Sequence, residues 1–141
     1  MADIDQIIDD FEFLDDWEDR YRYVIELGKA LPPMPESDKT GHNKVQGCVS
    51  QVWLVPEPER GDPADPILNF RGDSDAHIVR GLVAIALAAM SGRHASEIEA
   101  FDAVSLFSRL GLIENLTPQR ANGLRSMIRR IKAEAATAKA A

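Results

Sequence analysis

Apolar residues recur at helical spacing along the first part of the chain, and acidic residues occupy many of the positions between them. The first stripe consists of Ile4, Ile7, Ile8, Phe11 and Leu14. A second stripe follows Asp16, a favourable N-cap residue, and consists of Trp17, Tyr21, Val24, Ile25 and Leu31. Such spacing marks one face of an amphipathic helix. We therefore predict two helices, the second ending before Pro32, because proline cannot continue the hydrogen-bond ladder.

The helical pattern is lost over residues 32–47, which predict a long loop. Two segments rich in β-branched and aromatic residues follow, at 49–55 and 67–71, joined by a proline-rich connection. We predict two strands, the first of them ended by Pro56. Because two strands alone are marginally stable, we also expect a third short strand near residues 44–46 or close helix packing on one face of the sheet.

A third helix is predicted from Ser74 or Asp75 to Met90. Apolar residues cover most of its circumference, which is typical of a helix buried at the centre of a protein. Gly81 inside this helix indicates a close approach of another backbone. Gly92 fits the end of the helix, because glycine readily adopts the left-handed conformation found there.

Shorter signals predict the remaining helices. Ser96 and Glu99 match a capping box, which opens a short helix to Phe101. Residues 104–110 form another helix, ended by glycine. Thr117 at the cap and Pro118 at the first helical position begin the last helix. We expect the alanine-rich end of this helix, after residue 134, to fray.

The predicted elements are thus several helices and a small group of strands. The chain has 141 residues, 45% of them hydrophobic, which predicts one domain spanning residues 1–141. The net charge of -7 argues against binding to nucleic acid or to anionic membranes. The longest apolar run, residues 82–90, is too short to span a bilayer, and the acidic start does not resemble a signal peptide. We expect a soluble, cytoplasmic protein.

Charge is unevenly distributed along the sequence. Residues 1–26 contain ten acidic residues and two arginines, whereas residues 118–141 contain six basic residues and one acidic residue. The simpler interpretation is that both segments are solvated helix faces. The alternative is that one of them is a docking face that steers a charged partner.

Cys48 is the single cysteine of the chain. An intramolecular disulfide and a multi-cysteine metal site are therefore excluded, and the widely spaced histidines show no metal-ligand pattern. We expect no metal ion and no cofactor. A free cysteine is most often buried and inert. However, Cys48 follows Gly47 at the junction between a long loop and a strand, a position from which a thiol can reach the surface.

Four segments of this sequence resemble the SufE family of iron–sulfur cluster assembly proteins. They are Trp-Glu-Asp-Arg-Tyr-Arg-Tyr-Val-Ile-Glu-Leu-Gly with the Leu-Pro-Pro that follows (17–33), Val-Gln-Gly-Cys-Val-Ser-Gln-Val-Trp (45–53), Gly-Asp-Ser-Asp-Ala-His-Ile-Val-Arg-Gly-Leu (72–82) and Leu-Thr-Pro-Gln-Arg-Ala-Asn-Gly-Leu (116–124). They occur in the family's order, span almost the whole chain, and include the single cysteine in the expected segment.

The resemblance implies a sulfur carrier with an α+β fold, in which a small antiparallel sheet packs against several helices, and which is shared with the IscU-type scaffold. SufE proteins take sulfane sulfur from the persulfide of a PLP-dependent cysteine desulfurase, of the SufS type or a close relative, and stimulate that enzyme. They then deliver the sulfur to an iron–sulfur scaffold complex of the SufB type. Such a protein is a sulfurtransferase-type carrier and activator rather than a stand-alone enzyme.

The resemblance assigns the acceptor role to Cys48. Candidate contacts to the persulfide or the partner are Gln46, Gly47, Ser50, Gln51, Asp75 and Arg120. Each has a simpler interpretation: strand-edge polar groups for the residues beside Cys48, a helix cap for Asp75 together with Asp73 and Ser74, and a solvated first-turn side chain for Arg120. His42 and Lys44 could supply positive charge to the thiol, but the favoured interpretation is that they are ordinary loop residues.

Two other classes of protein remain as alternatives. One is a scaffold that assembles clusters itself, against which the single cysteine argues, because such sites use several thiolates. The other is an interaction module in which Cys48 is inert or structural.

Overall fold

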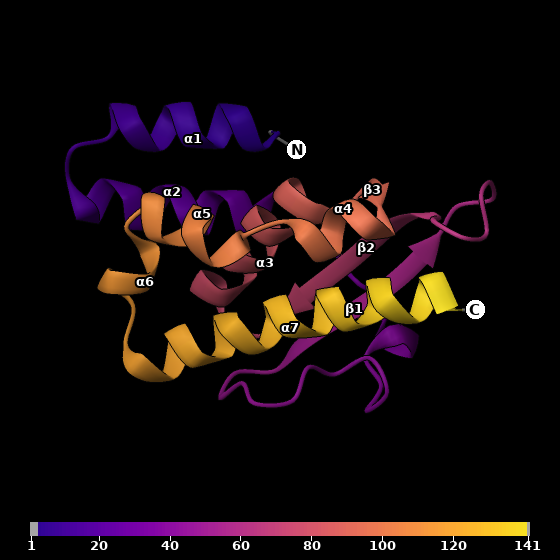
Figure 1. Cartoon of the computed structure of the whole chain (residues 1–141). Coiled ribbons are helices and arrows are strands. Elements are labelled where there is room, and N and C mark those ends of the chain that lie inside the picture. Colours follow the sequence, from indigo (N-terminus) through magenta and orange to yellow (C-terminus); the bar gives the residue numbers. More distant parts are fainter. Residues whose placement is uncertain (1–2, 141) are drawn as a thin grey trace.

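The computed structural model describes residues 3–140. Its elements, in chain order, are α1 (Ile4–Phe13), α2 (Trp17–Lys29), a 3-10 turn η1 (Glu36–Asp38), β1 (Val52–Pro58), β2 (Ile67–Ser74), α3 (His77–Met90), β3 (Arg93–His94), α4 (Ala95–Ala100), α5 (Ala103–Arg109), α6 (Leu112–Asn115) and α7 (Pro118–Ala140). A three-stranded antiparallel sheet packs against helices, which confirms the α+β class (Figure 1).

The first two helices form as predicted from their apolar stripes. Asp3 caps α1 and Asp16 caps α2, each accepting a hydrogen bond from a backbone N–H of the first turn. The prediction that Leu31 belongs to the second helix was wrong. The helix ends at Lys29, and Leu31 reaches the core from the turn that follows.

The strand boundaries differ from the prediction. β1 begins at Val52 rather than at residue 49, and it continues through Pro56, which pairs with Phe70 of β2. The strand order is β1-β2-β3, so β1 lies at an edge of the sheet. A proline is tolerated where its missing N–H faces away from the neighbouring strand. The expected pairing near residues 44–46 is a single bridge between Lys44 and Trp53, and the third strand is β3.

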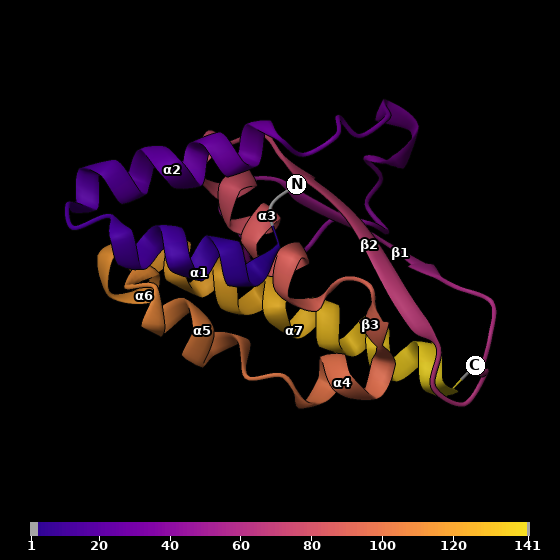
Figure 2. The same cartoon turned by 90° about the horizontal axis from the view of Figure 1, so that it is seen from above.

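Helix α3 lies at the centre of the molecule, between α2 and the sheet (Figure 2). The predicted close approach occurs at Gly81, whose backbone lies against Val24 of α2. A Cβ atom added to Gly81 would lie 2.1 Å from the carbonyl oxygen of Val24. The helix begins at His77, so Ser74 and Asp75 lie outside it and the prediction that it starts there was wrong.

Three further differences concern the second half of the chain. The predicted capping box of α4 was wrong: the side chain of Glu97 accepts from the backbone N–H of His94, while Ser96 bonds to Asp65. Helix α6 was not predicted. Helix α7 continues past residue 134, where fraying was expected, to Ala140, and Ala135 is fully buried within the core.

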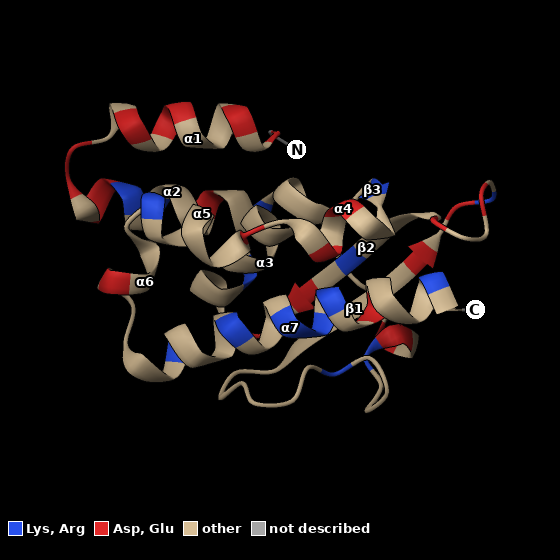
Figure 3. Ribbon diagram, viewed as in Figure 1, with Lys and Arg blue, Asp and Glu red and all other residues tan. Residues whose placement is uncertain are grey.

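The charge asymmetry of the sequence appears on the surface of the fold. Acidic side chains are concentrated on α1, whereas basic side chains recur along α7 (Figure 3). Within residues 3–140, no helix is both long enough and apolar enough to cross a membrane.

Candidate functional site

Cys48 lies in a short loop that is closed at its base by backbone hydrogen bonds. The N–H of Val45 donates to the carbonyl of Val52 over 2.8 Å, and the N–H of Leu54 donates to the carbonyl of Asn43 over 2.9 Å. These bonds therefore hold together the two ends of the loop formed by residues 46–51. Gly47 within it has a φ of +89°, a left-handed conformation that favours glycine.

Gln51 anchors one end of this loop to the segment between β2 and α3. Its backbone N–H donates to the carboxylate of Asp75 over 3.0 Å, and its carbonyl accepts from the hydroxyl of Ser74 over 2.7 Å. The interpretation of Asp75 as a cap of the central helix was therefore wrong. Its carboxylate holds the strand-side end of the cysteine loop, and Ser74 acts with it.

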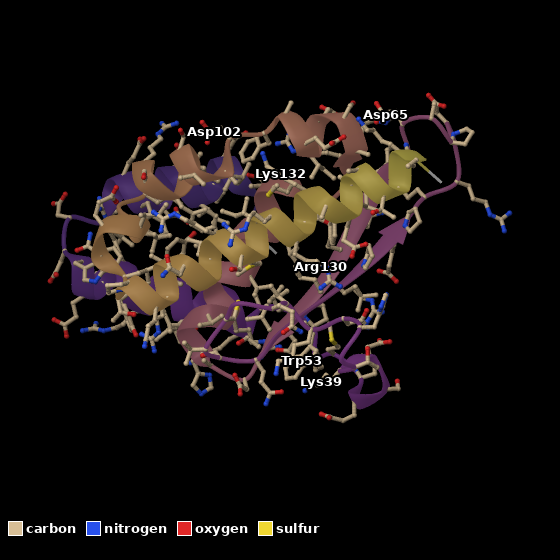
Figure 4. All side chains as sticks on the ribbon, turned by 60° about the horizontal axis from the view of Figure 1, so that its bottom comes forward. Lys39, Trp53, Asp65, Asp102, Arg130 and Lys132 are labelled. Atoms are coloured by element: carbon tan, nitrogen blue, oxygen red, sulfur yellow. The ribbon has the colours of Figure 1, made fainter. Side chains whose placement is uncertain are left out.

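Arg130 of α7 anchors the other end. Its guanidinium donates to the carbonyl of Lys44 over 3.0 Å and to the carbonyl of His42 over 2.6 Å, and it pairs with Glu134 over 2.9 Å. Figure 4 shows Arg130 on the side of α7 that faces this segment. The planar guanidinium thus uses several donors to fix the backbone that leads into the loop.

We predict that Arg130→Met frees the entrance of the loop. Hydrogen bonds that involve a charged group contribute roughly 1.5–3 kcal/mol each, so their loss weakens the resting position of Cys48. Alkylation of Cys48 by iodoacetamide is expected to become about fivefold faster. Arg129→Met, a change at the adjacent exposed arginine, serves as the control. Equal rates in all three proteins would contradict the anchoring role.

The Cys48 thiol lies over a cavity of about 290 Å³ between the loop, α3 and α7. Its S–H donates to the carbonyl oxygen of Gly123 over 3.4 Å. The walls combine apolar side chains with a few polar groups, and they are formed by Cys48, Val49, Ser50, Val79, Leu82, Thr117, Gln119, Arg120, Gly123, Leu124 and Met127. The cavity thus leaves room for a small group beside the sulfur.

Arg120 stands on the wall of this cavity, as a half-buried side chain rather than a solvated one. Its guanidinium donates to the hydroxyl of Tyr21 over 3.3 Å, which holds it against α2. Neither His42 nor Lys44, the two residues considered as sources of positive charge, lines the cavity. Among residues 3–140, Arg120 is therefore the cation that lies on the same cavity as the thiol.

Burial raises the pKa of the Cys48 thiol above its ordinary value. The thiolate is the reactive form, so at neutral pH the resting protein holds Cys48 protonated and slow to react. We predict that its alkylation rate rises with pH to a midpoint above the ~8.5 of a free thiol. In urea the midpoint is expected to fall back to that value. Identical pH profiles for the folded and unfolded chain would contradict this.

An ion-pair cluster around the buried carboxylate of Asp73 lies beneath the strand-side anchor. Asp73, only 7% exposed, pairs with Arg80 over 3.0 Å and with Lys39 over 3.8 Å, and it accepts the N–H of Ser74. The ammonium of Lys39 also stands 5.3 Å from the centre of the Trp53 ring. Figure 4 shows these two residues next to each other. The cluster connects the long loop, β2 and α3 at the point where Gln51 is held.

The structure separates the predicted site residues into two groups. Cys48, Ser50 and Arg120 meet at the cavity. Gln46, Gly47, Gln51 and Asp75 are exposed around it, the last two joined by their hydrogen bond. The roles of Arg130 and Gly123 were missed. Gly123 lies in a segment that carries the family resemblance, whereas no sequence signal linked Arg130 to the loop.

These observations define a small α+β protein with one thiol on an anchored loop above a cavity. The family model "SufE: Fe-S metabolism associated domain" matches residues 5–135. The chain is 68% identical over 135 residues to an uncharacterized SufE-like protein of Rhizobium etli, covering 96% of this chain and 90% of that protein. It is 69% identical to an uncharacterized SufE-like protein of Rhizobium meliloti, covering 96% of both.

The chain therefore belongs to the SufE family, whose members take part in iron–sulfur metabolism. The fold is also similar to the solution structure of a hypothetical protein from Thermus thermophilus. That comparison gives a TM-score of 0.76 at 19% identity and covers 98% of this chain and 96% of the other. At this level of identity, the likeness concerns the fold.

Proposed function

We propose that this chain is a single-domain sulfur carrier of the cytoplasm that accepts sulfane sulfur on Cys48. The donor is the persulfide of a PLP-dependent cysteine desulfurase, which the carrier also stimulates. The recipient is an iron–sulfur scaffold complex. The observation that carries the proposal is the placement of the chain's sole cysteine, in a member of the SufE family, on an anchored loop beside an open cavity.

The proposed transfer is a displacement at sulfur. The Cys48 thiolate attacks the outer sulfur of the donor persulfide, a new S–S bond forms on Cys48, and the donor cysteine leaves as a thiolate. The proton lost by Cys48 balances the proton gained by the donor, and no external oxidant or reductant is consumed. The carrier needs a single thiol for this step.

The resting site favours a thiol that reacts only on demand. Burial keeps Cys48 protonated, and the S–H group is bonded to the carbonyl of Gly123. Exposed thiolates are readily oxidised, so a carrier benefits from a cysteine that is withheld until a partner docks. Arg120, on the same cavity, is the group best placed to stabilise the negative charge of a thiolate or a persulfide.

The decisive experiment is the intact mass of the protein after incubation with a cysteine desulfurase, PLP and cysteine in the absence of reductant. Wild type is expected to gain one sulfur atom, and Cys48→Ser none. The rate of alanine formation by the desulfurase is measured in the same reactions. Wild type is expected to raise it, and Cys48→Ser to lose most of that stimulation.

The other outcomes identify other classes of protein. Failure of wild type to gain sulfur from two desulfurases of different type, both active, would overturn the proposal. If the protein then still bound a partner, it would be an interaction module with an inert cysteine. Reconstitution of a coloured cluster on the protein alone would instead indicate a scaffold of the IscU type.

A further inference from the structure

Val49 is an apolar side chain in an unexpected place. It is 77% exposed although it adjoins the half-buried Cys48, and both residues contribute to the wall of the same cavity. Among residues 3–140, few large hydrophobic side chains are this exposed. An exposed valine at the rim of an apolar cavity can bury its apolar surface there if the adjoining part of the cavity becomes vacant.

The loop allows Cys48 and Val49 to exchange places. Cys48 is half-buried and its neighbour Val49 is 77% exposed, so the two adjacent side chains are oriented differently, and a rotation of this part of the loop that moves one outward moves the other inward. The base of the loop is fixed by the pairing of Val45 with Val52 and by the Gln51 anchor. Gly47, with its left-handed conformation, adjoins Cys48 and provides the backbone freedom for such a rotation.

The cavity matches a valine side chain in chemistry. Below the thiol its walls are formed by Val79, Leu82, Leu124 and Met127. Departure of the Cys48 side chain leaves these walls without contacts on one side, which is unfavourable. A branched apolar side chain restores those contacts and removes its own apolar surface from water, whereas a polar side chain would lose its hydration there.

We propose that Val49 is a positioning residue for Cys48: when the thiol leaves the cavity to meet its partner, the side chain of Val49 enters and takes its place. This inference rests on the proposed function, in which the donor persulfide must reach the sulfur of Cys48. Entry of Val49 into the cavity stabilises the open loop, and this role explains why a hydrophobic residue is exposed beside the thiol in the resting protein.

The test uses the purified protein alone and measures the rate at which iodoacetamide alkylates Cys48. Since Cys48 is the sole cysteine, the rate reports the population of the open loop. Val49→Ser is expected to lower the rate about tenfold, which corresponds to about 1.4 kcal/mol less stabilisation of the open state. Val49→Ile, which keeps an apolar branched side chain, is expected to stay within about twofold of wild type.

The controls separate this role from others. Val104→Ser changes a valine that is 39% exposed on α5, away from the cavity, and is expected to leave the rate unchanged. Rates in urea must be equal for all variants, which excludes a change in the chemistry of the thiol. An unchanged rate in Val49→Ser would overturn the inference. A faster rate would do so as well, because Val49 would then be a cover over the resting thiol.

The inference and the proposed function can fail separately. If wild type gains sulfur from a desulfurase while Val49→Ser alkylates like wild type, the carrier role stands and the exchange is wrong. If Val49→Ser alkylates slowly while wild type gains no sulfur from any desulfurase tested, the exchange stands and the carrier role is wrong.

Discussion

Replacement of Gly81 by alanine is expected to lower the free energy of unfolding by at least about 3 kcal/mol. The added Cβ atom would lie 2.1 Å from the carbonyl oxygen of Val24 and 2.5 Å from its side chain, so α2 and α3 must move apart. On the opposite side of the contact, a Cβ atom on Gly28 would lie 2.7 Å from the backbone nitrogen of Gly81. Overpacking a core typically costs about 1–3 kcal/mol, and clashes between backbones that cannot yield cost more.

Urea unfolding followed by circular dichroism measures this effect. Gly41→Ala is the matched control, because a Cβ atom at Gly41 meets nothing within 4 Å. Its free energy of unfolding is expected to remain within about 0.5 kcal/mol of the wild-type value. A Gly81→Ala protein as stable as the control would show that the two helices do not cross at this distance.

Asp73→Ala is expected to destabilise the protein by about 3 kcal/mol. The substitution removes the carboxylate that faces Arg80 within the fold and leaves that guanidinium without its counter-charge. Removing the buried partner of an ion pair is costly, because the remaining guanidinium, whose side chain is only 24% exposed, is incompletely hydrated. The N–H of Ser74 also loses its acceptor, so the strand-side anchor of the cysteine loop is weakened.

The control for this variant is Glu36→Ala, which removes an exposed carboxylate paired with the same Lys39. Exposed ion pairs contribute about 0–1 kcal/mol, so this protein is expected to unfold close to wild type. Unfolding in urea at low and high salt distinguishes the two sites, since buried charges are screened much less than exposed ones. Equal losses in both variants would contradict the special position of Asp73.

Features that depend on nearby residues were predicted well from the sequence. The apolar stripes of α1 and α2 and the all-round apolar pattern of α3 depend on spacing within one helix, and each helix forms where its pattern lies. The caps at Asp16 and Thr117 are equally local, with bonds spanning two and three residues. The close contact at Gly81 was predicted because a glycine inside a buried helix indicates that another backbone approaches the helix at that position.

The errors arose where a residue acts on a distant part of the chain. Ser96 was interpreted as a cap within its own helix, but its partner Asp65 lies 31 residues away. Asp75 was interpreted in the same way, although it bonds to Gln51 across 24 residues. The two carbonyls that Arg130 holds lie 86 and 88 residues before it. No local pattern encodes such pairs, and only the fold brings them together.

The position of Pro56 has a consequence for how the sheet can associate. Backbone groups of Val52 and Leu54 point outward from β1, toward Val45 and Asn43. By the alternation of a strand, the nitrogens of Pro56 and Pro58 face the same outer side and carry no hydrogen to donate. One half of this edge is thus already paired, and the other half offers carbonyl acceptors but lacks the N–H donors of a full ladder. Pairing of two copies of the protein along β1 is therefore disfavoured, which protects this edge from a common route to aggregation.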